Sequence, residues 1–307
     1  MPERVREGKQ ETLRPGKGGR SSPMSIHSPD SRPACRLAFA LLVNRPEAAI
    51  DVAEAMLLIA KEEYPDLDVA QYLVQLDDMA AAVRGAAGDT ADPYRLIAAL
   101  NHHLFQVQGF RGNTEDYQDP RNSFLNEVLD RRIGIPITLA VVYLEVGRRL
   151  GLRLYGVGMP GHFLVKYVVP DEEIVLDPFD GGTILSAADC QRILDRIFEG
   201  KLAFEPHLLA AVGPRQILTR MLTNLKTIYF NNQEYGKALL VVEWLLILNP
   251  QAATEIRDRG LLCCQFRRYA EASADLERYL RLAPAAEDSE VIREHLRSLR
   301  QRMVALN

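Results

Sequence analysis

Cysteine is scarce in this sequence of 307 residues, which contains only Cys35, Cys190, Cys263 and Cys264. Four cysteines are too few for a disulfide-stapled scaffold, and no two of them have the CxxC spacing of a metal site. This usage favours a reduced, cytoplasmic setting, and we expect neither a metal nor another cofactor. The question that remains for these four residues is whether any of them is a nucleophile.

A surplus of positive charge is also absent, because the formal net charge is −4 and the isoelectric point is about 5.9. This balance argues against a nucleic-acid binder that relies on a basic field. The longest early apolar run, residues 37–43, is far shorter than the ~20 residues of a membrane-spanning helix. No small-residue cleavage site follows this run, so we expect neither a membrane contact nor a secretion signal.

The first part of the chain divides into a tail and a helical region. Residues 1–33 are rich in charged residues, Gly, Ser and Pro and contain almost no large apolar residues, so we expect a disordered tail. Met1 and Met24 are both candidates for the start of translation. From Pro46 onward apolar residues recur at helical spacing, and mostly helical structure is predicted as far as His102.

The central region, within residues 34–205, has the pattern of an α+β domain. Residues 136–150 are apolar nearly all round and begin with a proline, which is typical of a buried central helix. Strand-like runs follow at residues 152–158, 163–169 and 173–176, separated by turn residues. A central helix packed on an antiparallel sheet of at least three strands is the simplest fold.

Residues 206–307 contain an internal repeat with a period of 34 residues. The matching pairs are Tyr235/Tyr269, Ala238/Ala272, Leu248/Leu282 and Pro250/Pro284. This period, with Ala in the second helix and Pro at the end, is typical of tetratricopeptide repeats. We predict two helix pairs and a capping helix over residues 291–303, docked on the central domain. A protein partner is expected to bind this region, and association of two copies of the chain is the alternative.

Two residues of the predicted sheet are suited to acid–base chemistry. His162 begins one strand and Asp177 ends the next, so their side chains can meet across the sheet. The aspartate would then hold the imidazole in one tautomer and stabilise its protonated form. The alternatives are a turn histidine satisfied by the backbone, and simple turn chemistry at Asp177 and Asp180.

Further polar residues cluster in the loops around the central helix and the sheet. We interpret them as groups that line or brace one cleft beside His162, with helix capping and loop hydrogen bonding as the alternative. They are Asn113, Asp116, Tyr117, Asp119, Asn122, Arg132 and Asp180.

Three motifs follow one another along the chain: NSFLNEVLDRRIGIPITL at residues 122–139, GMPGHFLV at 158–165 and DPFDGG at 177–182. With the repeats behind them, they resemble the SirB1 family, whose members carry a transglutaminase-like domain followed by tetratricopeptide repeats. The resemblance covers roughly residues 35–300. It implies a papain-like core in which a catalytic Cys opens the central helix and the His and Asp come from the following strands.

According to the resemblance, His162 and Asp177 occupy the positions of the family's histidine and aspartate. The place of the catalytic Cys falls on Pro136, which we count among the cleft residues. Proline supplies neither a nucleophile nor an N–H, whereas a thiolate there would be activated by the helix N-terminus. None of the four cysteines lies where it could substitute. We therefore expect a catalytically degenerate protein that acts as a binding or adaptor protein.

An active hydrolase or acyltransferase is the alternative function. Its nucleophile would be the hydroxyl of Thr138 or Ser123, within hydrogen-bond reach of His162. A bound metal is a second version of this alternative, with the ligands His162, Asp177, Asp116 and Asp119. A purely structural adaptor that acts through its repeats is the third hypothesis.

Overall fold

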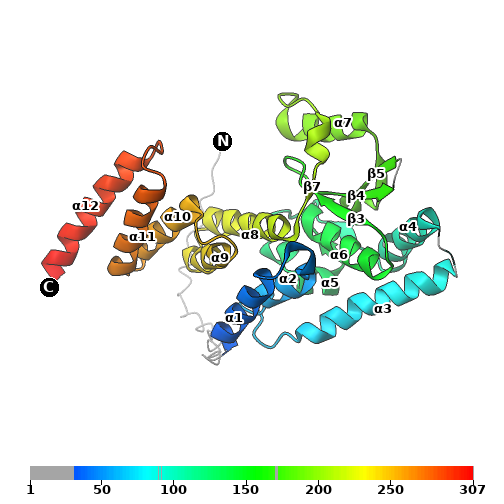
Figure 1. The fold of residues 1–307 in the computed structure, drawn as a ribbon, viewed down its shortest axis with the longest axis horizontal. Coiled ribbons are helices and arrows are strands. Elements are labelled where there is room, and N and C mark those ends of the chain that lie inside the picture. The colour runs from blue at the N-terminus through cyan, green and yellow to red at the C-terminus, as the bar shows by residue number, and fades with distance from the viewer. Residues whose placement is uncertain (1–30, 89, 91, 170–171, 307) are drawn as a thin grey trace, which may run out of the picture.

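The computed structural model describes residues 31–88, 90, 92–169 and 172–306. A helical N-terminal part and a small sheet surround the central helix α6, and paired helices extend from them toward the C-terminus (Figure 1). The predicted class, α+β followed by an all-helical region, is confirmed.

The N-terminal part is built from helices with aspartate caps. Its helices are α1 Ser31–Val43, α2 Val52–Ala60, α3 Val69–Ala87 and α4 Pro93–Asn101. The carboxylates of Asp51, Asp68 and Asp92 accept backbone N–H groups in the first turns of α2, α3 and α4, which satisfies donors that have no partner inside the helix. The chain leaves α4 through a π-helical turn, His102–Val107.

The predicted tail, residues 1–33, lies mostly outside the described residues, as do both candidate start sites. Its last three residues are an exception, because α1 begins at Ser31. Helix α1 is held against the repeats: the Phe39 ring meets Trp244 edge-on at 4.9 Å, and Arg36 Nη1 lies 2.6 Å from Glu243 Oε2. The folded part therefore begins earlier than residue 34.

The central sheet has five antiparallel strands in the order β6-β5-β4-β3-β7. The strands are β3 Leu154–Val157, β4 Leu164–Val169, β5 Glu172–Asp177, β6 Thr183–Leu185 and β7 Ala211–Val212. The three longest correspond to the predicted strands. The patterns missed β6 and β7, because two or three residues are too few to show an alternation.

Helices cover both faces of this sheet. The central helix α6, Pro136–Arg149, packs on β3 and β4 and follows α5, Leu125–Arg131. On the other face, Val157, Leu164 and Val175 form a small second core with residues of α7, Ala187–Phe198. A short parallel pair, β1 Arg111–Gly112 and β2 Ile133–Gly134, lies beside the start of α6.

The C-terminal region consists of two helix pairs and a last helix. These are α8 Pro214–Asn231, α9 Tyr235–Leu248, α10 Ala253–Gln265, α11 Tyr269–Leu282 and α12 Ser289–Leu306. The repeat positions Ala238 and Ala272 are fully buried. Gly260 allows α11 to approach, because a Cβ there would lie 2.9 Å from Leu276. The predicted capping helix falls within α12.

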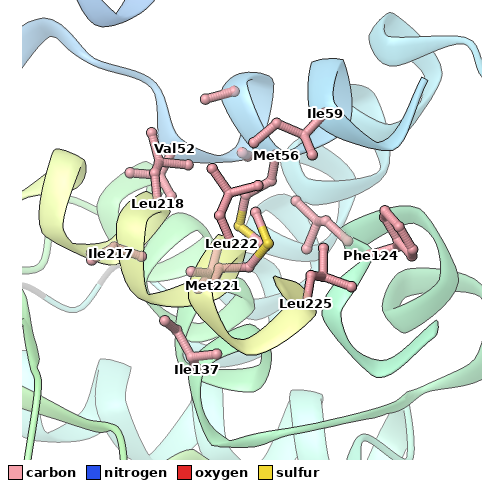
Figure 2. Packing of buried hydrophobic residues seen from close by; sticks show 14 of the residues in the cluster. Val52, Met56, Ile59, Phe124, Ile137, Ile217, Leu218, Met221, Leu222 and Leu225 are labelled. Carbon is pink, nitrogen blue, oxygen red and sulfur yellow. The ribbon is translucent and has the colours of Figure 1, made fainter. Parts of the chain in front are cut away.

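The first repeat helix is part of the central core. Figure 2 shows its side chains packed between Val52, Met56 and Ile59 of α2 and Ile137 of α6. The α8 residues in this contact are Ile217, Leu218, Met221, Leu222 and Leu225. The strand β7 also lies beyond residue 205, where we expected the domain to end, yet it pairs with β3. The sheet and the repeats therefore share α8 and the segment before it.

Among the described residues, no helix combines the length and the apolar content that crossing a bilayer requires.

Leu222 tests how far the fold depends on α8. Its side chain is fully buried, so we expect Leu222→Ala to lower the free energy of unfolding by about 2–5 kcal/mol through lost burial and a cavity. Leu41, which is 63% exposed on α1, supplies the matched control, and Leu41→Ala should change stability by less than ~0.5 kcal/mol. Urea denaturation of the two variants measures the difference, and similar midpoints would contradict this role of α8.

Candidate functional site

His162 and Asp177 face each other at one end of two neighbouring strands. His162 comes shortly before β4, and Asp177 is the last residue of β5. Because these strands are antiparallel, with Val165 opposite Leu176, the start of β4 lies beside the end of β5. The His162 Nε2 atom lies 2.8 Å from Asp177 Oδ2.

The carboxylate of this pair is oriented from two sides. Asp177 Oδ1 accepts a hydrogen bond of 3.0 Å from the backbone N–H of Phe179, whose ring meets the His162 ring edge-on at 5.9 Å. The side chains of His162 and Asp177 are only 11% and 5% exposed. An ionised Asp177 accepts the proton of Nε2, which leaves Nδ1 as the acceptor of the ring. This geometry suits a base at Nδ1 whose protonated form Asp177 stabilises.

A cavity of about 760 Å³ lies beside the pair. Pro136, the first residue of α6, lies in its wall with His162 and Asp177. Tyr117 and Asp180 line it from the neighbouring loops. Other lining residues outside α7 are Thr114, Gly161, Phe179, Thr183 and Leu185. The structure thus places Pro136 in one cavity with the histidine and the aspartate.

One face of α7 forms the opposite wall, and the motifs did not point to it. Its lining residues are Asp189, Arg192, Ile193, Arg196 and Ile197, spaced as on one side of a helix. Cys190 and Leu194 face away, into the second core. The N-terminus of α7 carries a capping box, Ser186 with Asp189, and this signal could have located the helix in the sequence.

None of the described residues that line the cavity is a cysteine. Cys35, Cys190 and Cys263 are buried, and Cys264 is partly buried in α10. Burial raises the pKa of all four thiols, in the case of Cys263 to about 11. For Cys190, the charges of Asp189 and Asp177 act in the same direction. Such thiols are protonated at neutral pH, and therefore weak nucleophiles.

The two candidate hydroxyls are not hydrogen-bonded to His162. Thr138 Oγ1 donates to the carbonyl oxygen of Asn122 at 2.8 Å and accepts the backbone N–H of Ile135 at 3.1 Å. Ser123 Oγ is buried without a hydrogen-bond partner in the described part of the chain. Neither residue lines the cavity. Thr138 therefore joins the start of α6 to the 3₁₀ turn Pro120–Ser123, which precedes α5.

Asn113 and Asn122 brace the loop on the cavity side of α6. Asn122 is fully buried, and its Nδ2 donates to the carbonyl oxygen of Asp116 at 2.8 Å. Asn113 Nδ2 donates to Asn122 Oδ1 at 3.1 Å, and the Asn113 backbone N–H donates to the carbonyl oxygen of Gly134. Both asparagines and Asp116 thus hold the loop that carries Tyr117, rather than lining the cavity.

The remaining predicted residues lie apart from the dyad. Asp119 pairs with Arg121 at 2.8 Å and Arg131 at 3.4 Å. Burial opposes ionisation of Asp119, but the hydrogen bonds and charge of Arg121 prevail and lower its pKa. Arg132 ends α5 in a left-handed conformation, φ 60°, with its guanidinium 4.9 Å from the centroid of Phe110. Neither Asp119 nor Arg132 lines the cavity.

The described residues, 31–88, 90, 92–169 and 172–306, contain no arrangement of side chains that supports a metal site. There, no group of three or more His, Cys, Asp or Glu side chains is placed to hold an ion. The four ligands of the metal alternative therefore do not come together as one site.

Comparison with known proteins agrees with this architecture. Residues 70–223 match the transglutaminase-like superfamily, and residues 225–297 match a tetratricopeptide repeat family. No solved structure matches the chain. The first of these matches ends inside α8, as expected if this helix belongs to both parts.

Relatives match the chain over most of its length. A UPF0162 protein of Xylella fastidiosa is 38% identical over 83% of this chain and 92% of its own length. One from Pseudomonas aeruginosa is 32% identical over 83% of this chain and 90% of its own. Human F-box only protein 21 is 32% identical over 43% of this chain and 21% of its own length. The chain belongs to the UPF0162 family, with a transglutaminase-like domain followed by tetratricopeptide repeats.

Proposed function

We propose that this protein is a SirB1-type, cytoplasmic adaptor that binds a segment of a partner protein in a transglutaminase-like cleft without thiol chemistry. One observation carries the proposal: Pro136 lines the same cavity as the hydrogen-bonded His162 and Asp177. A base and a group that orients it are present, and a proline occupies the helix start in the same cavity.

The chemistry of acyl transfer explains why this matters. A thiolate at a helix N-terminus is stabilised by the helix dipole and by a neighbouring imidazolium, and it attacks the substrate carbonyl. The pyrrolidine ring of Pro136 has no atom that can take this role. The four native thiols lie outside the cavity with raised pKa values, so none supplies the missing nucleophile.

The lining of the cavity favours a polypeptide ligand. Apolar side chains such as Phe179 and Ile193 line it together with the charged Asp180 and Arg196, and its volume, in the range of small-molecule sites, has room for a few side chains of a partner segment. Repeats of this kind expose extended surfaces that bind proteins, which supports a second contact of the partner with residues 206–307. Neither contact requires a metal or another cofactor.

The wild-type protein should show no acyl-transfer activity. We expect amine incorporation into a glutamine-containing protein, and hydrolysis of peptide substrates, at the background rate of the His162→Ala variant, because the nucleophile is missing. Robust turnover that disappears in His162→Ala would overturn the adaptor proposal and favour a hydrolase or acyltransferase with another nucleophile.

Restoring a thiol tests the geometry directly. In Pro136→Cys the new thiol would sit at the N-terminus of α6 in the cavity with His162, so we expect alkylation by iodoacetamide at least ~10-fold faster than at any native cysteine. Mass spectrometry of the labelled peptides measures each site separately. The double variant Pro136→Cys/His162→Ala should lose most of this advantage.

Pro136→Ser is the matched control, since it also removes the proline but adds no thiol. Its native cysteines should label as slowly as those of the wild type. If Cys at position 136 reacts no faster than the partly buried Cys264, Pro136 does not occupy the nucleophile place and the proposal fails.

A further inference from the structure

Arg220 extends from the first repeat helix, α8, to the turn that carries His162. Its Nη2 atom donates to the carbonyl oxygen of Met159 at 2.9 Å and to that of His162 at 2.6 Å. Its guanidinium carbon lies 5.5 Å from the ring centroid of Phe163. One side chain of α8 therefore contacts three residues of this turn.

The guanidinium of Arg220 has no carboxylate partner in the described parts of the chain. Burial lowers its pKa, and the nearby Tyr117 only partly offsets this. In contrast, Arg257 and Arg259 in the repeats pair with Asp288 and Asp275. A partly buried cation must recover its lost hydration from other groups. For Arg220 these are the two carbonyl oxygens of the turn.

The turn has few hydrogen bonds of its own. The His162 backbone N–H donates to the Met159 carbonyl oxygen at 3.1 Å, and Gly161 adopts a φ of +70°. His162 lies before β4 begins, outside the hydrogen-bond ladder of the sheet. Arg220 thus binds both carbonyl oxygens that flank the residues Pro160 and Gly161.

Gly158 leaves room for the close approach of α8 to the turn. A Cβ at this position would lie 3.3 Å from Arg220 Nη1 and 3.3 Å from Val212 Cγ1. These distances are slightly shorter than ordinary van der Waals contact, so a Cβ there would push the guanidinium or the Val212 side chain aside by a few tenths of an ångström.

The helix that carries Arg220 packs on both the core and the first repeat. Met221 and Leu222, its neighbours in sequence, are buried against α2 in the core of Figure 2. The same helix packs along α9 in the first repeat. A movement of the repeats that shifts α8 would therefore shift Arg220.

We propose that Arg220 is a positioning residue through which the first repeat helix sets the orientation of His162 against Asp177. This role of Arg220 lies in the geometry of the pair, whether or not the cleft turns over a substrate. It also provides a physical route by which a protein bound to the repeats changes the cleft.

The imidazole of His162 reports this role directly. In the full-length protein labelled with ¹⁵N-histidine, long-range ¹H–¹⁵N spectra distinguish the two tautomers, and His162→Gln assigns its signal among the six histidines. We expect the wild type to show the Nε2–H tautomer that Asp177 selects. Arg220→Met keeps a flexible apolar stem but removes the guanidinium and its donors, so this signal should be lost to exchange between orientations. Arg220→Lys, which keeps a charge and a donor, should restore it.

Arg215→Met is the matched control on the same helix, because Arg215 pairs with Glu47 at 3.1 Å, away from the turn. It should leave the His162 signal unchanged. A wild-type His162 signal in a folded Arg220→Met variant would overturn the proposal, and so would an equal loss in Arg215→Met.

Gly158→Ala keeps the test decisive if Arg220→Met does not fold. The added methyl group should push the guanidinium by a few tenths of an ångström away from its place against the turn and weaken the Nε2–H signal, while circular dichroism remains that of the wild type. An unchanged His162 signal in folded Gly158→Ala would then count against Arg220 as the positioning residue.

Discussion

Burial of the apolar face of α8 is the constraint on which the arrangement of this protein depends. Met221, Leu222 and Leu225 fill the space beside α2 that neither the sheet nor the N-terminal helices close. The 34-residue sequence period assigns this helix to the repeats, whereas its side chains pack in the core of the central domain. A chain cut at residue 206 would lose both α8 and β7, and with them one edge of the sheet.

The same helix links the core to the cleft. From α8, Arg220 holds the turn before β4, and β4 and β5 then bring His162 to Asp177. On the other side, Thr138 and Asn122 attach the start of α6 to its loop, so Pro136 is held in the cavity wall. The cleft is thus built by elements from both parts of the chain.

Much of the fold could be predicted because its signals are local. Pro136 and the apolar residues after it predict the start and the burial of α6. The 34-residue period identifies the two helix pairs. The short strands β6 and β7 carry no such signal. Among the site residues, the meeting of His162 and Asp177 follows from their places at the ends of adjacent strands. The positions of Asp119 and Arg132 outside the cavity could not be predicted in this way. They depend on contacts in space, of Asp119 with Arg131 and of Arg132 with the Phe110 ring.

The sequence by itself determined which chemical groups this protein has: a histidine, an aspartate, a proline at the helix start and only four thiols. Only the tertiary structure decided which of these groups share a cavity, because their distances depend on strand register and helix packing. It places Pro136 in one cavity with His162, turns Cys190 into a second core, and lines the cavity with one face of α7. The contact of Arg220 with His162 is the clearest example of what only the tertiary structure decided, because no local sequence pattern connects two residues that lie 58 positions apart.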